Sequence, residues 1–116
     1  MMDSQPLDLE EPFARVDAAR ARELLEAGAQ LVDVREPVEY AEAHIPGARL
    51  VPLGTFLARP REFLQRDDVV FVCAVGIRSA LACEMAAAIG FERVYNLEGG
   101  VQAWASRGLP LERQAG

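Results

Sequence analysis

A cysteine, a glycine and an arginine follow one another closely between Cys73 and Arg78. The residues before them, 69–73, form an apolar run that favours a buried strand, and residues 79–89 have the composition of a buried helix. In such a strand–loop–helix unit, the N–H groups of the loop, the positive end of the helix and the Arg78 guanidinium all stabilise an anion. We therefore predict that Cys73 is a thiolate nucleophile attacking a substrate bound at the same place.

The predicted substrate-binding loop directly follows the cysteine and consists of Ala74, Val75, Gly76, Ile77 and Arg78. Its spacing is C-x4-R, whereas a cysteine-dependent phosphatase needs C-x5-R to wrap three phosphoryl oxygens. The smaller loop suits a narrower group such as a terminal sulfane sulfur, so sulfur transfer is favoured over phosphatase or arsenate reductase chemistry. Such phosphatases also use an aspartic acid as general acid, and the obvious candidate, Asp33, lies in a run of structural character.

Other polar and small residues are given supporting roles. Asp33 lies on a second predicted strand and Arg35 directly follows that strand, and we expect a charge-assisted hydrogen bond between them that shapes the floor of the site. His44 precedes Ile-Pro-Gly and is predicted to order a loop rather than act as a base. Cys83 lies inside an apolar helix and is predicted to pack there. The pair Gly99–Gly100 is predicted to be a turn that lets the backbone approach the cysteine loop.

The inventory of reactive side chains excludes several classes of enzyme. The chain has 116 residues, with two cysteines, one histidine and no lysine. Without lysine, neither Schiff-base chemistry nor a phosphate-loop site is available. The two cysteines and the histidine amount to three soft ligands, one fewer than a closed zinc site needs, so we predict no metal.

The charge balance limits the partners and the compartment. Twelve arginines against eighteen acids give a net charge of -6 and a pI near 4.8, which disfavours nucleic acid as a partner. The charge-free runs are far shorter than a membrane span, and the acidic start of the chain does not resemble an export signal. Two cysteines without such a signal are expected to be free thiols, and we expect a cytoplasmic protein with no membrane partner.

Helix and strand patterns alternate along the chain. The predicted helices cover residues 18–27, 37–43, 60–64, 79–89 and 101–106, and the predicted strands cover residues 31–34, 49–51, 69–73 and 93–96. We expect this alternation to form a small parallel α/β sheet with helices on both faces and ligands at the carboxyl ends of the strands. One domain is predicted over residues 13–109, with a flexible acidic tail at 1–12 and a C-terminal tail at 110–116.

Three motifs carry a family signal: LVDVREPVEYAEAHIPGARLVPL at Leu31 to Leu53, VVFVCAVGIRSALA at Val69 to Ala82, and VYNLEGGVQAW at Val94 to Trp104. Together and in this order, they make the chain resemble the single-domain rhodanese-like sulfurtransferases. The resemblance extends from about Phe13 to Leu109. It implies a five-stranded parallel sheet with helices on both sides, with Cys73 as the sulfur-accepting nucleophile and Ala74 to Arg78 as the active-site loop.

The same resemblance implies a rhodanese-type enzyme that needs no cofactor. Cys73 would take sulfur from thiosulfate, polysulfide or a protein persulfide, and pass it to cyanide or to a thiol, including that of a thioredoxin-like or sulfur-carrier protein. Many family members place a basic or hydroxyl-bearing side chain where this loop has Ala74 and Val75, so we expect weak turnover of thiosulfate. That apolar pair also leaves open a non-catalytic rhodanese-like module that binds a partner protein.

Overall fold

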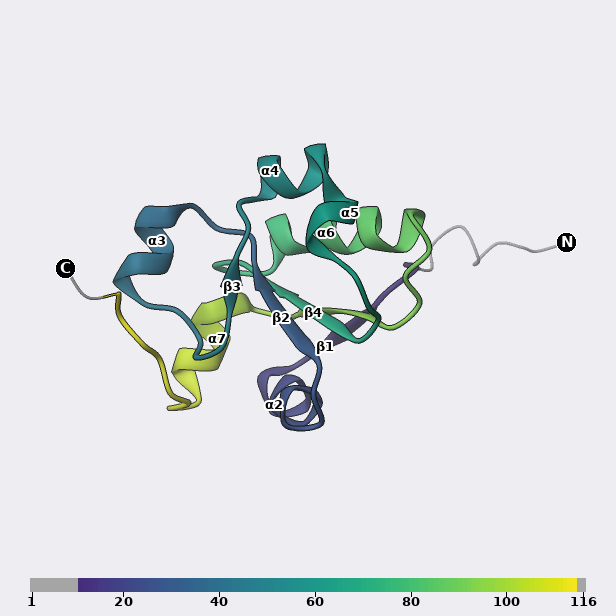
Figure 1. Cartoon of the computed structure of the whole chain (residues 1–116). Helices are drawn as coiled ribbons and strands as arrows, with labels where there is room; N and C mark the ends of the chain where they lie inside the picture. Colours follow the sequence, from purple (N-terminus) through teal and green to yellow (C-terminus); the bar gives the residue numbers. More distant parts are fainter. Residues whose placement is uncertain (1–10, 115–116) are drawn as a thin grey trace, which may run out of the picture.

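Five parallel strands form one sheet in the computed structural model, which describes residues 11–114 (Figure 1). In chain order they are β1 (Ala14–Val16), β2 (Gln30–Asp33), β3 (Arg49–Leu50), β4 (Val69–Val72) and β5 (Val94–Leu97). Across the sheet the order is β1-β5-β4-β2-β3, and every pairing is parallel. The carboxyl ends of the strands therefore share one edge, which is where a parallel sheet binds its ligands.

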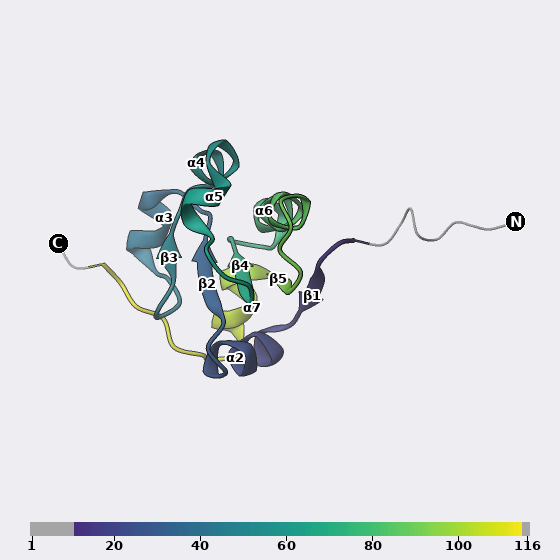
Figure 2. The same ribbon diagram turned by 45° about the vertical axis from the view of Figure 1, so that its right-hand side comes forward.

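Six helices accompany the sheet in the described part of the chain. They are α2 (Ala18–Glu26), α3 (Pro37–Glu42), α4 (Leu53–Ala58), α5 (Pro60–Phe63), α6 (Ile77–Ala88) and α7 (Gly100–Ser106). Helices α4, α5 and α6 cover one face of the sheet, and α2 and α7 cover the other. Helix α3 lies beyond β3, the last strand of the sheet on that side (Figures 1 and 2). The prediction of a parallel α/β sheet with helices on both faces is confirmed.

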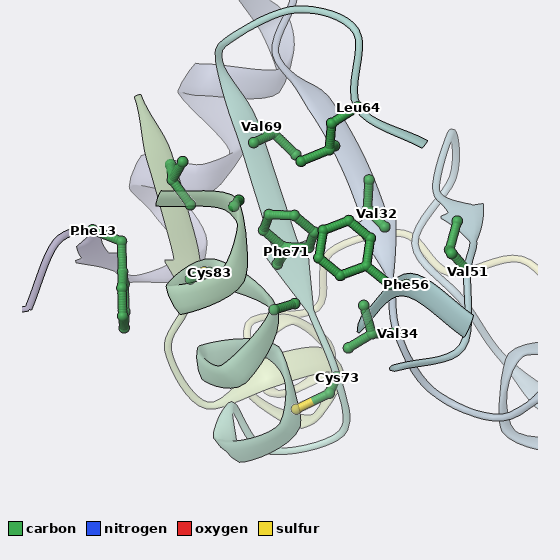
Figure 3. Close-up of a cluster of buried hydrophobic side chains, with 13 residues drawn as sticks. Phe13, Val32, Val34, Val51, Phe56, Leu64, Val69, Phe71, Cys73 and Cys83 are labelled. Atoms are coloured by element: carbon green, nitrogen blue, oxygen red, sulfur yellow. The ribbon is translucent and has the colours of Figure 1, made fainter. Parts of the chain in front are cut away.

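The core consists of two apolar layers separated by the sheet. Strand β4 is its centre, since every residue from Val69 to Val72 is 0% exposed and alternate residues face opposite layers. On the α6 side, the rings of Phe56 and Phe71 pack with their centroids 5.2 Å apart (Figure 3). With one apolar layer on each side, the apolar run before Cys73 forms a strand buried on both faces, as its composition predicts.

Local signals account for several of the element boundaries. Asp17 caps α2 by accepting a hydrogen bond from the N–H of Arg20 at 2.8 Å, and Gly28 follows that helix with a positive φ of 106°. Two elements were not predicted from the residue pattern. Strand β1 has three residues, of which one is buried, and α4 buries one residue, Phe56, so neither carries enough apolar periodicity to be seen.

The last described residues contact the domain near α3. The backbone N–H groups of His44 and Glu112 each donate to the other's carbonyl oxygen at 2.8 Å, and Trp104 Nε1 donates to the carbonyl of Pro110 at 2.8 Å. The flexible tail predicted at residues 1–12 falls mostly outside the described residues. Between residues 11 and 114, the structure has no helix with the length and apolarity needed to cross a membrane.

Candidate active site

Cys73 is the first residue after β4, at the carboxyl edge of the sheet. Its sulfur points towards the beginning of α6 (Figure 3), accepts a hydrogen bond from the N–H of Gly76 at 3.1 Å, and lies 3.3 Å from the hydroxyl oxygen of Ser79, within reach of that donor. The residue is 1% exposed, so few water molecules compete with these donors. Hydrogen bonds donated to a buried sulfur stabilise its anionic form.

The ionisation of Cys73 reflects a balance between burial and these donors. Burial alone would raise the pKa of the thiol, because a charged sulfur loses its hydration. The hydroxyl of Ser79 and the backbone N–H groups of Ser79, Gly76 and Val75 outweigh this cost, and the pKa of Cys73 lies below the ordinary value. A larger fraction of thiolate at neutral pH favours attack on sulfur.

A buried polar network stands behind the sulfur. The hydroxyl of Ser79 donates to Oδ1 of Asn96 at 2.5 Å, and Nδ2 of Asn96 donates to the carbonyl oxygen of Gly76 at 3.0 Å. Ser79 and Asn96 are both 0% exposed. Asn96 thus links strand β5 to the loop at Gly76 and to the first turn of α6, which fixes the positions of both groups that donate to Cys73 Sγ.

A close backbone contact with α7 also shapes the loop. The N–H groups of Val101 and Gln102 donate to the carbonyl oxygens of Cys73 and Ala74 at 2.9 and 3.2 Å. A Cβ atom on Gly100 would lie 2.4 Å from the carbonyl oxygens of both residues, and Gly100 has a φ of 62°. Only glycine permits this approach, so the prediction that the glycine pair brings backbone against the loop is confirmed.

Arg78, the predicted anion-binding residue, forms an ion pair with Glu39 of α3. Its Nη1 and Nη2 atoms donate to Oε1 and Oε2 of Glu39, each at 2.9 Å. The side chains are 36% and 32% exposed. The Arg78 guanidinium is the main cause that lowers the pKa of Glu39, to about 2, so the pair is intact at neutral pH and is lost only as the pH falls towards that value.

The expected pair between Asp33 and Arg35 forms at the end of β2. Arg35 Nε donates to Oδ1 of Asp33 at 3.0 Å and Nη2 donates to Oδ2 at 2.8 Å, and both residues are buried. Nη2 also donates to the carbonyl oxygen of Ala43 at 2.7 Å, at the end of α3. The pair therefore attaches α3, which supplies Glu39, to the sheet.

The two other residues considered for chemistry have structural contacts. Cys83 is 0% exposed in the α6 layer of the core, and burial raises its pKa, which leaves a thiol that packs. The ring of His44 stacks on Tyr40 with the centroids 3.8 Å apart, and its Nδ1 lies 2.8 Å from the Tyr40 carbonyl oxygen. These contacts agree with the packing role predicted for Cys83 and the loop-ordering role predicted for His44.

Three residues of the site were not predicted from the sequence. Asn96 offered a signal, because a polar residue inside an apolar strand must find a hydrogen-bonding partner when the strand is buried. Ser79 was assigned only to the start of a helix, but α6 begins earlier, at Ile77, so Ser79 lies in its first turn and faces the sulfur. Glu39 gave no signal, since it lies 39 residues from Arg78 in the chain.

The fold and the site define a class of protein: a parallel α/β domain with a buried, hydrogen-bonded cysteine at the carboxyl end of its central strand. Comparison with known proteins identifies the family. The sequence profile of the Rhodanese-like domain matches residues 17–107. The chain belongs to the rhodanese-like domain family, as the three motifs predict.

Similar proteins include sulfurtransferases and a solved structure of the same fold. A protein of Allochromatium vinosum named as a sulfurtransferase is 43% identical over 81 residues, which covers 70% of this chain and 76% of that protein. A thiosulfate sulfurtransferase of Pseudomonas paraeruginosa is 35% identical over 102 residues, covering 84% and 89%. The crystal structure of a rhodanese-related protein of Thermoplasma volcanium is 33% identical with a TM-score of 0.76, covering 86% and 98%.

Proposed function

We propose that this protein is a sulfurtransferase that carries sulfane sulfur as a persulfide on Cys73. The observation that carries the proposal is the sulfur at the carboxyl end of the sheet, which accepts a hydrogen bond from a loop N–H, lies within reach of a hydroxyl donor and has a lowered pKa. Membership of a family whose relatives include sulfurtransferases supports it. The site needs no cofactor for this chemistry, because the thiolate is itself the nucleophile.

The reaction has two sulfur-exchange steps. In the first, the Cys73 thiolate attacks the outer sulfur of a donor. With thiosulfate, a new S–S bond forms, the bond to the sulfonate sulfur breaks, and the bonding pair leaves with sulfite, so Cys–S⁻ and S–SO₃²⁻ give Cys–S–S⁻ and SO₃²⁻. In the second, a thiolate or cyanide attacks the outer sulfur of the persulfide and restores the Cys73 thiolate. The N–H groups of the loop stabilise the negative charge in both steps.

The surface of the loop favours a donor or acceptor with an apolar contact surface over free thiosulfate. The exposed side chains of the loop are Val75 and Ile77, at 45% and 73% exposure. The charge of Arg78 is compensated by Glu39, so a small dianion meets little net positive charge. We propose that polysulfide or a protein persulfide is the donor, and that the acceptor is a protein thiol such as that of a sulfur-carrier or thioredoxin-like protein.

A second candidate function is a non-catalytic module that binds a partner protein. It is favoured by exposed apolar side chains, which are Val75 and Ile77 in the loop, Leu81 in α6 and Val38 in α3. A module that only binds a partner makes no use of the hydrogen-bonded sulfur of Cys73. Sulfur transfer is therefore the better-supported function.

Mass spectrometry of the intact protein tests the proposal. The reduced protein is incubated with thiosulfate, with polysulfide, or with the persulfide of a small thiol, and the adduct is located by peptide mapping. We expect one added sulfur on Cys73 with the polysulfide and thiol-persulfide donors, less with thiosulfate, and its removal by cyanide. Absence of the adduct with every donor would refute the proposal and leave the binding module.

Releasing Arg78 from its ion pair is expected to improve the use of thiosulfate. In the Glu39→Gln variant, the guanidinium loses its anionic partner, while the glutamine side chain can still accept the hydrogen bond that Glu39 Oε1 takes from the N–H of Glu36 at 2.9 Å. The KM for thiosulfate should fall about twofold to fivefold, the range expected for one partly exposed ion pair. Steady-state kinetics with cyanide as acceptor measures it.

The control for this prediction is Glu42→Gln, which removes the same charge from an exposed position at the end of α3. Its KM for thiosulfate should stay close to that of the unmodified protein. Equal changes in both variants would mean that long-range charge, and not the contact with Arg78, sets the KM.

A further inference from the structure

The single proton of the Ser79 hydroxyl has two acceptors in this structure. Its oxygen lies 2.5 Å from Asn96 Oδ1 and 3.3 Å from Cys73 Sγ. A hydroxyl donates one hydrogen bond and accepts others, so Ser79 cannot donate to both at once. All three residues are buried, with at most 1% exposure, so water does not readily replace a missing partner.

The orientation of the Asn96 amide is fixed by the loop. The carbonyl oxygen of Gly76 lies 3.0 Å from the terminal nitrogen of Asn96. A backbone carbonyl is only an acceptor, so the Asn96 NH₂ group must face it, and turning the amide over would bring two acceptors together. Oδ1 is therefore left facing Ser79, and an amide oxygen can only accept. When the sulfur is uncharged, the Ser79 hydroxyl therefore donates its hydrogen bond to Asn96 Oδ1.

We propose that Asn96 is a positioning residue that holds the Ser79 proton away from Cys73 Sγ until the sulfur carries a negative charge. In the thiol form, the Cys73 S–H donates to the lone pair of Ser79. When the thiol ionises, the hydroxyl turns and donates to the thiolate, and Asn96 Oδ1 loses its partner. Asn96 thus competes with the thiolate for one proton, at the cost of a buried acceptor left unpaired.

The same exchange operates during the proposed reaction cycle. In the persulfide, the negative charge resides on the outer sulfur and Sγ is uncharged. The Ser79 hydroxyl therefore turns back and donates its hydrogen bond to Asn96 again. No proton enters or leaves in this rearrangement, because only the hydroxyl rotates. Ser79 therefore supports the thiolate as nucleophile and as leaving group, and it withdraws from Sγ in between. The relevance of this step rests on the proposed function, whereas the exchange itself requires only the ionisation of Cys73.

A double-mutant cycle on Cys73 ionisation tests the proposal without measuring sulfur transfer. The four proteins carry Cys83→Ala alone, or with Ser79→Ala, with Asn96→Ala, or with both substitutions. The thiolate absorbance is titrated in the ultraviolet, with the corresponding Cys73→Ser protein subtracted. Because the titration needs no sulfur donor, a protein that fails to transfer sulfur can still confirm or refute the exchange.

Opposite shifts are expected from the two single substitutions. Ser79→Ala should move the titration midpoint up by about one pH unit, since the thiolate loses a donor, and Asn96→Ala should move it down by a similar amount, since Ser79 no longer has a second acceptor. In the Ser79→Ala background, the Asn96→Ala substitution should lower the midpoint no further. An equal shift from Asn96→Ala in both backgrounds would overturn the proposal, because it would show that Asn96 acts only through the loop.

Infrared spectroscopy gives a second readout that does not depend on the folding of any Asn96 variant. Below the midpoint, the S–H stretching band of Cys73 is recorded in the Cys83→Ala protein. An S–H that donates to Ser79 absorbs at lower frequency than a free one, and the band should return to the free position in Ser79→Ala. A band at the free position in both proteins would overturn the proposal.

Discussion

Replacing Cys73 with serine is expected to reduce sulfur transfer to the level measured without protein. The serine hydroxyl is close in size to the thiol, so the donors at Gly76 and Ser79 keep an acceptor at nearly the same place. A hydroxyl does not ionise near neutral pH and forms no persulfide, so the first exchange step loses its nucleophile and the second has no persulfide to attack. Turnover of polysulfide with cyanide, together with the mass of the intact protein, measures the loss.

The matched control is Cys83→Ala, which removes the other thiol of the chain. Cys83 is buried in the core and burial raises its pKa, so we expect persulfide formation on Cys73 to persist at nearly the original rate. The small cavity should cost about 1 kcal/mol of unfolding free energy. A persulfide that still forms in Cys73→Ser and is lost in Cys83→Ala would contradict the proposal, because it would show that Cys83 is the sulfur-carrying thiol.

Adding one methyl group at Gly100 is expected to be the most damaging change outside the cysteine itself. The Cβ of Gly100→Ala would lie 2.4 Å from the carbonyl oxygens of Cys73 and Ala74, where only backbone can give way. The strain at a positive φ and the overpacking together should cost about 3 kcal/mol of unfolding free energy. The loop must also shift, and a displacement of about 1 Å in a catalytic group reduces a rate about a hundredfold.

Gly108→Ala provides the comparison for this change. Gly108 has a φ of 72°, close to the 62° of Gly100, but nothing lies within 4 Å of the added Cβ. It should lose about 1–2 kcal/mol from backbone strain and keep its transfer rate. Urea denaturation and persulfide formation are measured for both variants. Equal losses of activity would show that backbone strain, and not the contact with the loop, is responsible.

The site illustrates which contacts a sequence can and cannot reveal. The composition of residues 69–73 predicts a strand buried on both faces, and Cys73 at its end follows directly from chain order. The pair of Asp33 and Arg35 was also predicted, because its members are two residues apart. The contact between Arg78 and Glu39 was not, since nothing in the local pattern of either residue distinguishes this pairing from others that the charges permit.

The same limit applies to the elements of the fold. Long, strongly patterned segments such as α6 were predicted with small errors at their ends: the helix predicted at residues 79–89 runs from Ile77 to Ala88. Strand β1 is held by its pairing with β5, and α4 by the packing of Phe56 on Phe71, so both depend on partners far away in the chain. Their own residues carry too few apolar positions to indicate an element.

The α/β class, the family and the position of the cysteine can all be read from the amino-acid sequence, because they depend on patterns among residues that are neighbours in the chain. The surroundings of the sulfur depend on how the chain folds in three dimensions. The parallel sheet brings Asn96 of β5 behind Ser79, Glu39 of α3 beside Arg78, and the backbone of Gly100 against the loop. Hydrogen bonds and close contacts act over about 3 Å in space whatever the separation in sequence, so the ionisation of Cys73 is set by the fold.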